Sequence, residues 1–412
     1  MKDEDIQNLL GGFATDTLTD QERDLLFTAA LTNQQLFNAL ADEQALKEFL
    51  PRGRAYDETY SMPMENIHSL FKGGWLTTTA PKDWGGKGSN LDTDDPATYL
   101  QAIRVIARAC SGTAHCCQLQ NHTTWLLAAL ATPDQRERYI DPMFKEPFLC
   151  ASVGSEAKRR HMYMMNTQAK RVEGGWRITG EKNYATNGPE MSFAVIFAAI
   201  EGVTDYLDNH LMVIIEPGME GVRVDNSWYR PNGMRCAPSP IITLDNVFVP
   251  DRNVIAEPGA YPRGRWQGKY HLGFAANYLG TTEGMYNWYR KYVSERGKSK
   301  DPIIQMRTGE MKIALEAAES LFHEAIVAWP TRSVVEAELI SMAAKSMAAH
   351  VAFDLSHKIV HASGSTAMFE EFPLSRYIRD LETHVLHAGH DRTAQIIGQA
   401  ELGETFDSTL QR

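Results

Sequence analysis

The sequence has no run of about 18 consecutive apolar residues, which is the length that a helix needs to cross a membrane. Residues 1–16 carry acids and lack the apolar core of a secretory signal peptide. Both absences predict a cytoplasmic protein without a membrane span.

Cysteine is scarce, and the five cysteines form neither a Cys-x-x-Cys pair nor the partnered histidine spacing of a zinc site. An odd number of cysteines in a chain without a secretion signal is typical of reduced thiols. Free cysteines are usually buried, so we expect five buried thiols and no metal ion. They are Cys110, Cys116, Cys117, Cys150 and Cys236.

An excess of basic residues is also missing. The chain holds 41 Lys and Arg against 52 Asp and Glu, which gives a formal net charge of -11. Because nucleic-acid phosphates require a basic surface, this balance argues against a nucleic-acid partner. It is compatible with a small neutral or cationic substrate.

The 412 residues are too many for one compact core and predict two or three packed domains. The first of them, residues 1–145, has helical spacing that begins with an amphipathic stretch at 25–30. Further helices are expected over about residues 95–109 and 112–131, and from Pro133 onward. We therefore predict an N-terminal helical domain.

Between residues 146 and 256 the period of the pattern changes. Short apolar runs are separated by clusters of Gly, Asn and Pro, which is typical of antiparallel strands. The runs cover 174–180, 193–200, 211–215 and 241–249. We predict a middle antiparallel β domain here.

The last third, residues 257–412, is helical again. An i, i+4, i+7 stripe is made by Met311, Leu315, Ala318, Phe322 and Ala325. Residues 337–360 are small and apolar with the same period, as is typical of bundle and subunit contacts. The predicted fold class is therefore α+β, with a helical domain, a β domain and a C-terminal helical bundle in that order.

Three segments carry a resemblance to a known family. They are Gly74-Trp75 through Trp84-Gly85-Gly86 and Gly88; 150–156 followed by 180–188; and Gly233-Met234-Arg235 followed by 244–250. Their order and spacing, within a pattern of helices, strands and helices, are similar to the acyl-CoA dehydrogenase superfamily. The resemblance covers about residues 60–405.

The resemblance implies a bound flavin and assigns residues to it. Ser152, Ser155 and Thr186 match positions at which loop backbone and small hydroxyls hydrogen-bond to the flavin ring. Tyr184 falls where an aromatic residue usually packs on that ring. Without the resemblance, these Ser and Thr side chains would be expected only to satisfy local backbone groups.

The carboxylate base of acyl-CoA dehydrogenases is missing at its expected place. When residues are counted without gaps from the Phe-Pro pair at 372–373, the base position falls on Ala388, which cannot accept a proton. The alternative position of some family members falls near Tyr270, where no carboxylate stands. A shift of three residues would put Asp391 at the base position, which leaves a dehydrogenase open.

The same region resembles the flavin-dependent monooxygenase branch that includes dibenzothiophene monooxygenase. That branch carries two histidines three residues apart, and His384 and His387 match them on one helical face. Ser155 matches a serine implicated near the flavin there, and His122 is a looser match for a third polar group. In that branch reduced flavin reacts with oxygen, and an imidazole with a pKa near neutrality can supply a proton. Without the resemblance, such histidines would more often be ordinary surface or core residues.

The residues that hold the adenylate half of FAD in family dehydrogenases are only partly present. Arg296 and Gly364 remain as cofactor-binding candidates. The aromatic residue that follows the arginine in the family is replaced, and His361 stands where the family has a glutamine. Arg296 with Lys298 and Lys300 can still neutralise a phosphate. The pattern favours FMN, or transiently bound reduced flavin, over tightly held FAD.

Three hypotheses follow. The lead is a two-component flavin monooxygenase with a separate flavin reductase, in which His384, His387, Ser155 and His122 act on O2 and a small organic substrate. The alternative is an FAD-dependent acyl-CoA or carrier-bound acyl dehydrogenase with Asp391 as base. A third is a binding or scaffold protein that keeps the fold without catalysis. The family is typically tetrameric, so the resemblance also implies a homotetramer.

Overall fold

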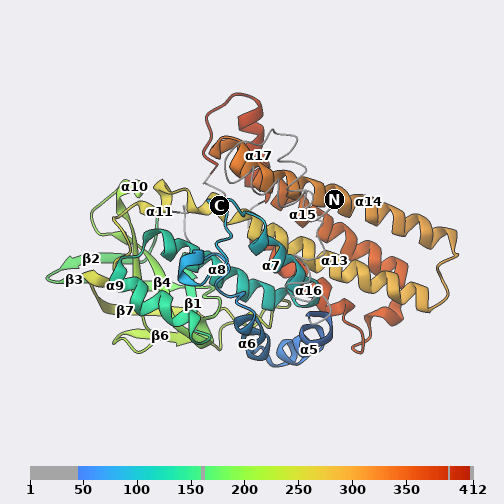
Figure 1. Ribbon diagram of the computed structural model, residues 1–412, viewed down its shortest axis with the longest axis horizontal. Helices are drawn as coiled ribbons and strands as arrows, with labels where there is room; N and C mark the ends of the chain where they lie inside the picture. The colour runs from blue at the N-terminus through green and yellow to red at the C-terminus, as the bar shows by residue number, and fades with distance from the viewer. Residues whose placement is uncertain (1–44, 159–162, 388–389, 409–412) are drawn as a thin grey trace.

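The computed structural model describes residues 45–158, 163–387 and 390–408. The helical stretch predicted at 25–30 and the base position at Ala388 lie outside the described residues. Helices come first, then a seven-stranded sheet, then helices again, and the sheet lies at the opposite end of the molecule from the long C-terminal helices (Figure 1). The predicted fold class is confirmed.

The N-terminal helices pack around α8, which is buried along most of its 20 residues. Cys110 separates α7 from α8 because its extended backbone interrupts the helical path between them. The elements are α5 (Leu50–Thr59), α6 (Met64–Lys72), α7 (Thr98–Ala109), α8 (Ser111–Leu130) and α9 (Pro133–Gln135), with π-helical turns at Ala45–Phe49 and Arg136–Ile140 and 3₁₀ turns at Lys82–Trp84 and Asp141–Phe144. The helices predicted over 95–109, over 112–131 and from Pro133 are confirmed.

The sheet has the strand order β1-β4-β2-β3-β7-β6, with β5 paired to β4. Its strands are β1 (Leu149–Val153), β2 (Gln168–Val172), β3 (Gly175–Lys182), β4 (Met191–Ile200), β5 (His210–Ile215), β6 (Val222–Asp225) and β7 (Ile241–Pro250). Four of the described strand pairs are antiparallel, as predicted. The prediction is wrong for the pairs β1–β4 and β2–β4, which are parallel. The chain that connects the two strands of each pair is long enough for a crossover.

The strand β4 explains how the sheet meets the helices. Its ten residues are almost all buried, and successive side chains point to opposite faces. Phe193, Val195 and Phe197 join the core shared with the helices. Residues 194, 196 and 198 join a second core within the curled sheet. Because both faces of β4 are covered, its sequence is a continuous apolar run and does not alternate.

The C-terminal bundle is built on α13, α14 and α15, which lie side by side (Figure 1). Asp301 caps α14 by accepting the backbone N–H of Ile303 at 2.9 Å, and Ser333 caps α15 in a reciprocal pair with Glu336. All five residues of the predicted α14 stripe are buried, which confirms it. The helices are α10 (Tyr206–Asn209), α11 (Ala260–Arg263), α12 (Trp266–Lys269), α13 (His271–Glu295), α14 (Pro302–Thr331), α15 (Val334–Ser363), α16 (Leu374–His384) and α17 (His390–Glu401), with 3₁₀ turns at Gly188–Glu190, Asp251–Asn253, Ser365–Met368 and Val385–His387.

None of the helices in the described ranges combines the length and the apolar composition that a membrane crossing requires.

Candidate active site

Four histidines gather around Phe274 where α8, α13 and α16 meet. His115 and His122 lie on α8, seven residues and therefore about two turns apart. Phe274 belongs to the first turn of α13. His384 is the last residue of α16, and His387 ends the 3₁₀ turn that follows it. We call these four imidazoles the histidine cluster.

One direct ring contact and the shared neighbour Phe274 hold the histidine cluster together. The centroids of His115 and His384 lie 4.6 Å apart with their planes at 74°. His387 stacks on Phe274 at 4.1 Å, and His122 lies 6.2 Å from the same ring. Only 8%, 2% and 5% of the surfaces of His115, His122 and His384 are exposed, so these imidazoles are withdrawn from bulk water.

The sheet contributes polar side chains to the same place. Thr186 lies in the turn after β3, and its Oγ1 is 3.2 Å from His115 Nε2 and 2.9 Å from Ser239 Oγ. Ser152 and Ser155, at the end of β1, are half-buried. The backbone N–H of Asn183 donates to the carbonyl of Ser155 at 3.0 Å, which ties the end of β1 to the turn that carries Thr186.

Burial favours the neutral form of three imidazoles, those of His115, His122 and His384. It lowers the pKa of His115 from 6.5 to about 4, and together with His115 and the Lys345 ammonium it lowers the pKa of His122 to about 3. The same three causes hold the pKa of His384 well below its usual range. Lys345, from α15, is 3% exposed and its Nζ lies 4.7 Å from the centroid of Phe274. The predicted pKa near neutrality is therefore wrong for His384, which is uncharged at pH 7.

The histidine cluster fits a polar ligand. Within the described residues, both ring nitrogens of His384 and Nε2 of His122 have no hydrogen-bond partner, although they are buried. Buried polar atoms normally have partners, so these nitrogens fit a bound group with donors and acceptors of its own. In the described part of the chain, no three His, Cys, Asp or Glu side chains are arranged to hold a metal ion. With Thr186 beside His115, the arrangement fits the polar edge of a flavin ring.

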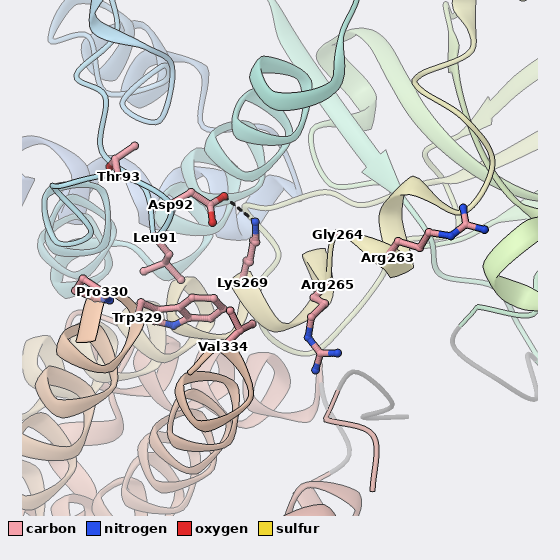
Figure 2. A pocket seen from close by; sticks show the side chains of 10 residues that line it. All are labelled: Leu91, Asp92, Thr93, Arg263, Gly264, Arg265, Lys269, Trp329, Pro330 and Val334. Atoms are coloured by element: carbon pink, nitrogen blue, oxygen red, sulfur yellow. Dashed lines mark hydrogen bonds and ion pairs between the residues drawn. The ribbon is translucent and has the colours of Figure 1, made fainter. Parts of the chain in front are cut away.

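An aromatic wall closes the far side of the histidine cluster. Tyr270 stacks on His122 at 4.3 Å, with Trp266 behind it at 6.1 Å. Beyond the wall lies the surface pocket of Figure 2, between the 91–93 turn, the 263–269 segment and the turn from α14 to α15. Lys269 stands at its rim, paired with Asp92 at 2.7 Å (Figure 2). Lys269 Nζ also lies 4.5 Å from the centroid of Trp266, so the rim of the pocket contacts the aromatic wall.

Other predicted site residues are not brought to the histidine cluster. Tyr184 is 56% exposed and packs against Trp228 at 5.1 Å. Asp391 is exposed in the first turn of α17. Arg296 follows the C-terminal end of α13, whose 25 residues span about 37 Å from the histidine end. Gly364 ends α15, 19 residues and about 28 Å beyond Lys345.

Two residues of this site were not among the predicted site residues, although the sequence holds a signal for each. His115 precedes His122 by seven residues, so both point from the same face of α8. Lys345 falls on the buried stripe of α15, four residues after Ser341 and three before Ala348. A lysine on such a stripe is a departure from the apolar pattern and marks a buried charge.

Family models match both ends of this chain. The model of the acyl-CoA dehydrogenase N-terminal domain matches residues 32–146, and that of the C-terminal domain matches residues 272–392. The chain is 26% identical over 376 residues to the short-chain specific acyl-CoA dehydrogenase of Clostridium acetobutylicum, covering 88% of this chain and 96% of that protein. It is 23% identical over 359 residues to the dibenzothiophene monooxygenase of Mycolicibacterium goodii, covering 80% and 85%.

Solved structures of both chemistries share the fold. The complex of TdsC from a Paenibacillus species with FMN and indole superposes with a TM-score of 0.77 at 21% identity, covering 90% of this chain and 98% of that one. A glutaryl-coenzyme A dehydrogenase complex superposes with a TM-score of 0.80 at 20% identity, covering 92% and 97%. Together with the two domain matches, which span more than half of its length, these likenesses establish that the chain belongs to the acyl-CoA dehydrogenase family of flavin-dependent oxidoreductases.

Proposed function

We propose that this chain is the oxygenase of a two-component flavin monooxygenase, which uses reduced flavin and O2 on a small organic substrate. The observation that carries the proposal is the position of His384. It is buried against His115, and both of its ring nitrogens lack a partner within the described residues. The alternative base, Asp391, is exposed on α17, whereas His384 is buried.

The flavin would be held by Ser152, Ser155 and Thr186 at the sheet, with His115 and His384 facing them from the helices. When bound, reduced flavin supplies the two electrons with which one oxygen atom enters the substrate and the other becomes water. FMN is supported over FAD by the substitutions around Arg296 and Gly364 and by the FMN complex of TdsC.

In this proposal the chain's own residues orient and stabilise charge. Neutral His384 offers one N–H donor and one acceptor nitrogen, whereas Nε2 of His115 is already paired with the Thr186 hydroxyl. An N–H that points at a reacting oxygen stabilises negative charge as it develops, and it does so more strongly in a site without bulk water. The buried Lys345 ammonium beside Phe274 adds positive charge to the same region. His384 and Lys345 therefore favour an anionic oxygen without a preceding protonation of the imidazoles.

The substrate side of the site is aromatic. Two pairs of stacked rings lie there. The interplanar angle is 18° between Phe274 and His387, and it is 6° between His122 and Tyr270. Flat apolar molecules pack well against such faces. We therefore propose a planar aromatic substrate, a class that includes the indole bound to TdsC.

The proposal is tested by mixing the protein with anaerobically reduced FMN and indole, then adding isotopically labelled O2. We expect labelled oxygen in the organic product, and no product when either O2 or reduced flavin is left out. Reduced FAD in parallel reports which flavin is used. If the protein forms no labelled product with any aromatic probe, and butyryl-CoA instead bleaches its flavin without O2, the monooxygenase assignment is wrong.

Two variants separate a catalytic histidine from a structural one. His384→Gln keeps a polar group of similar size but removes the imidazole, so we expect at least a tenfold loss of labelled product. His357→Gln, on the exposed face of α15, should leave product formation unchanged. Flavin binding by both variants, measured by fluorescence quenching, reports whether the site is still formed.

One observation favours a second candidate, an acyl-thioester dehydrogenase. The chain is 26% identical to a short-chain specific acyl-CoA dehydrogenase over most of both proteins. In this reading Asp391 would accept the proton α to the thioester carbonyl, so Asp391→Asn should abolish anaerobic flavin reduction by butyryl-CoA. Full reduction by that variant would exclude Asp391 as the base.

A further inference from the structure

Two buried cysteines lie side by side between the N-terminal helices and the sheet. Cys110 stands immediately before α8, and Cys236 lies in the segment between β6 and β7. Their sulfur atoms are 3.5 Å apart, although 126 positions separate them in the sequence. Both side chains are almost completely buried, at 1% and 0% exposure.

The packing around the two sulfurs holds them together. A Cβ at Gly112 would collide with Cys236 Sγ, so glycine lets the start of α8 approach the β6–β7 segment. Thr113 Oγ1 donates to Cys110 Sγ at 3.2 Å. A disulfide needs sulfurs about 2 Å apart, so a side-chain movement of about 1.5 Å would join them.

The electrostatic surroundings activate one thiol of the pair. A hydrogen bond from Cys236, opposed by burial and aided by the Arg376 guanidinium, lowers the pKa of the Cys110 thiol to about 6. The same hydrogen bond and burial raise the pKa of Cys236. Arg376 is fixed by its Nη2, which donates to the carbonyls of Leu50 at 3.1 Å and Ala109 at 3.2 Å. These surroundings favour the thiolate, which is the nucleophilic form, at Cys110 and leave Cys236 as the resolving thiol.

The cysteine pair lies next to the candidate active site. Cys110 stands immediately before α8, and His115 is the fifth residue of that helix. Cys236 precedes Ser239, the partner of Thr186, by three residues. A flavin site that handles O2 releases hydrogen peroxide whenever reduction of O2 is not coupled to the substrate, so this pair stands where that oxidant would arise.

We propose that Cys110 and Cys236 are a peroxide-reactive dithiol that closes to a disulfide. Cys110 attacks one oxygen of hydrogen peroxide, the O–O bond breaks, and a sulfenic acid and water form. Cys236 then attacks the Cys110 sulfur, the S–O bond breaks, and a second water leaves. Two thiols lose two electrons and two protons in all, and one peroxide is reduced to two waters.

The cross-link would fasten α8 to a segment that also holds the end of α16. In that segment the backbone N–H of Gly233 donates to Thr383 Oγ1 at 3.0 Å, and that of Met234 donates to Asp380 Oδ1 at 2.6 Å. His384 is the next residue after Thr383 and the fourth after Asp380 on α16. Oxidation would thus restrain the helix end that carries the proposed catalytic imidazole.

The test adds hydrogen peroxide to the folded, full-length protein, so it does not depend on the proposed function. We expect the number of thiols titrated after denaturation to fall from five to three, and to return to five with dithiothreitol. Peptide mapping without reductant should find Cys110 joined to Cys236. A count that stays at five, a different pair, or Cys110 found as sulfinic acid beside a free Cys236 would overturn the proposal.

Matched variants assign the bond without relying on one of them folding normally. After peroxide treatment, Cys236→Ser should show no loss of a pair of thiols and no cross-linked peptide. In Cys150→Ser the number of titrated thiols should fall from four to two. Cys150 is a fair control because it is equally buried, with its Sγ 3.3 Å from Gln120 Oε1. A cross-link that persists in Cys236→Ser also excludes the proposed pair.

Discussion

His115 Nε2 lies 3.2 Å from Thr186 Oγ1, and this contact joins the helices to the sheet. The Ser239 hydroxyl donates to the carbonyl of Ala237 at 2.8 Å, so it must accept the hydrogen of Thr186 at 2.9 Å. Thr186 has only one hydrogen to give and must in turn accept from His115. His115 is therefore protonated on Nε2, and its Nδ1 is left as an acceptor.

Thr186→Val should break this chain of hydrogen bonds. The His115 N–H would lose its acceptor in a buried place, which costs about 1–3 kcal/mol. We expect the free energy of unfolding to fall by about that amount and flavin to bind about tenfold more weakly. Urea unfolding and quenching of FMN fluorescence measure the two effects.

Thr186→Ser and Thr331→Val are the controls for this prediction. Serine keeps the hydroxyl and should restore most of the stability and of the flavin affinity. Thr331 is an exposed residue whose hydroxyl donates to the carbonyl of Val327 within its own helix. If Thr186→Val had the same free energy of unfolding and the same flavin affinity as Thr331→Val, the Thr186 hydroxyl would have no part in holding the cofactor.

The buried histidines predict a loss of stability in mild acid. The pKa of His115 is 6.5 in the unfolded chain and about 4 in the folded chain. Below pH 6.5 the unfolded chain therefore binds a proton at His115, whereas the folded chain does not bind it until the pH is near 4. The contribution of neutral His115 to the free energy of unfolding is fully present above pH 6.5 and declines until the pH reaches about 4. Between pH 7.5 and pH 5 this one group should remove about 2 kcal/mol from the free energy of unfolding.

The contribution of His115 is isolated by comparing variants at both pH values. His115→Asn cannot take up the proton, so its unfolding free energy should fall by about 2 kcal/mol less than that of the wild type between pH 7.5 and pH 5. His357→Asn, at an exposed position, should show the full wild-type loss. Equal slopes in all three proteins would contradict the neutral buried state of His115.

Regular periods made much of this fold predictable. The α14 stripe repeats with the helical period, and β4 is apolar on both faces because both are covered. The strand β2 was not predicted, because three of its five residues are exposed and polar. Parallel pairing of β1 with β4 leaves no periodic signal, since the direction of a partner strand depends on the path of the chain between them.

The site was predictable only where it resembled a family. His384 and His387 were matched to a pair in one branch of the family, and they do lie on Phe274. His115 was missed because 71 positions separate it from Thr186, and only the packing of α8 on the sheet brings them together. The exposure of Asp391 in the first turn of α17 likewise has no local signal in the sequence, because it depends on how that helix packs.

The buried carboxylate of Glu283 should be essential for joining α7 to α13. Its Oε1 accepts from Arg104 Nε at 2.6 Å, and its Oε2 accepts from Arg108 Nε at 2.7 Å. The Arg104 side chain is 2% exposed and that of Glu283 is 7% exposed. Glu283→Gln would leave two cations without their shared carboxylate, and breaking such a buried pair costs about 3–5 kcal/mol.

An exposed ion pair on the same helix is the control for Glu283. Glu295 pairs with Lys291 at 3.8 Å, and both side chains are more than half exposed. The free energy of unfolding of Glu295→Gln should equal that of the wild type, because exposed ion pairs contribute little to stability. Chemical unfolding of both variants measures the two free energies. A small effect of Glu283→Gln would mean that Glu319 alone balances the charge of Arg104.

An exposed apolar stripe on α14 predicts that the bundle assembles with copies of itself. Ile303, Met306 and Ile313 are 57%, 57% and 73% exposed, and their spacing of three and seven residues puts them on one face. Apolar side chains aligned in this way are usually covered in an assembly. Ile313→Asp should therefore lower the molar mass measured by light scattering from that of an oligomer toward 46.2 kDa. Leu402→Asp removes an equally exposed side chain outside the stripe and should leave the mass unchanged. A wild-type protein that is already monomeric would refute the prediction.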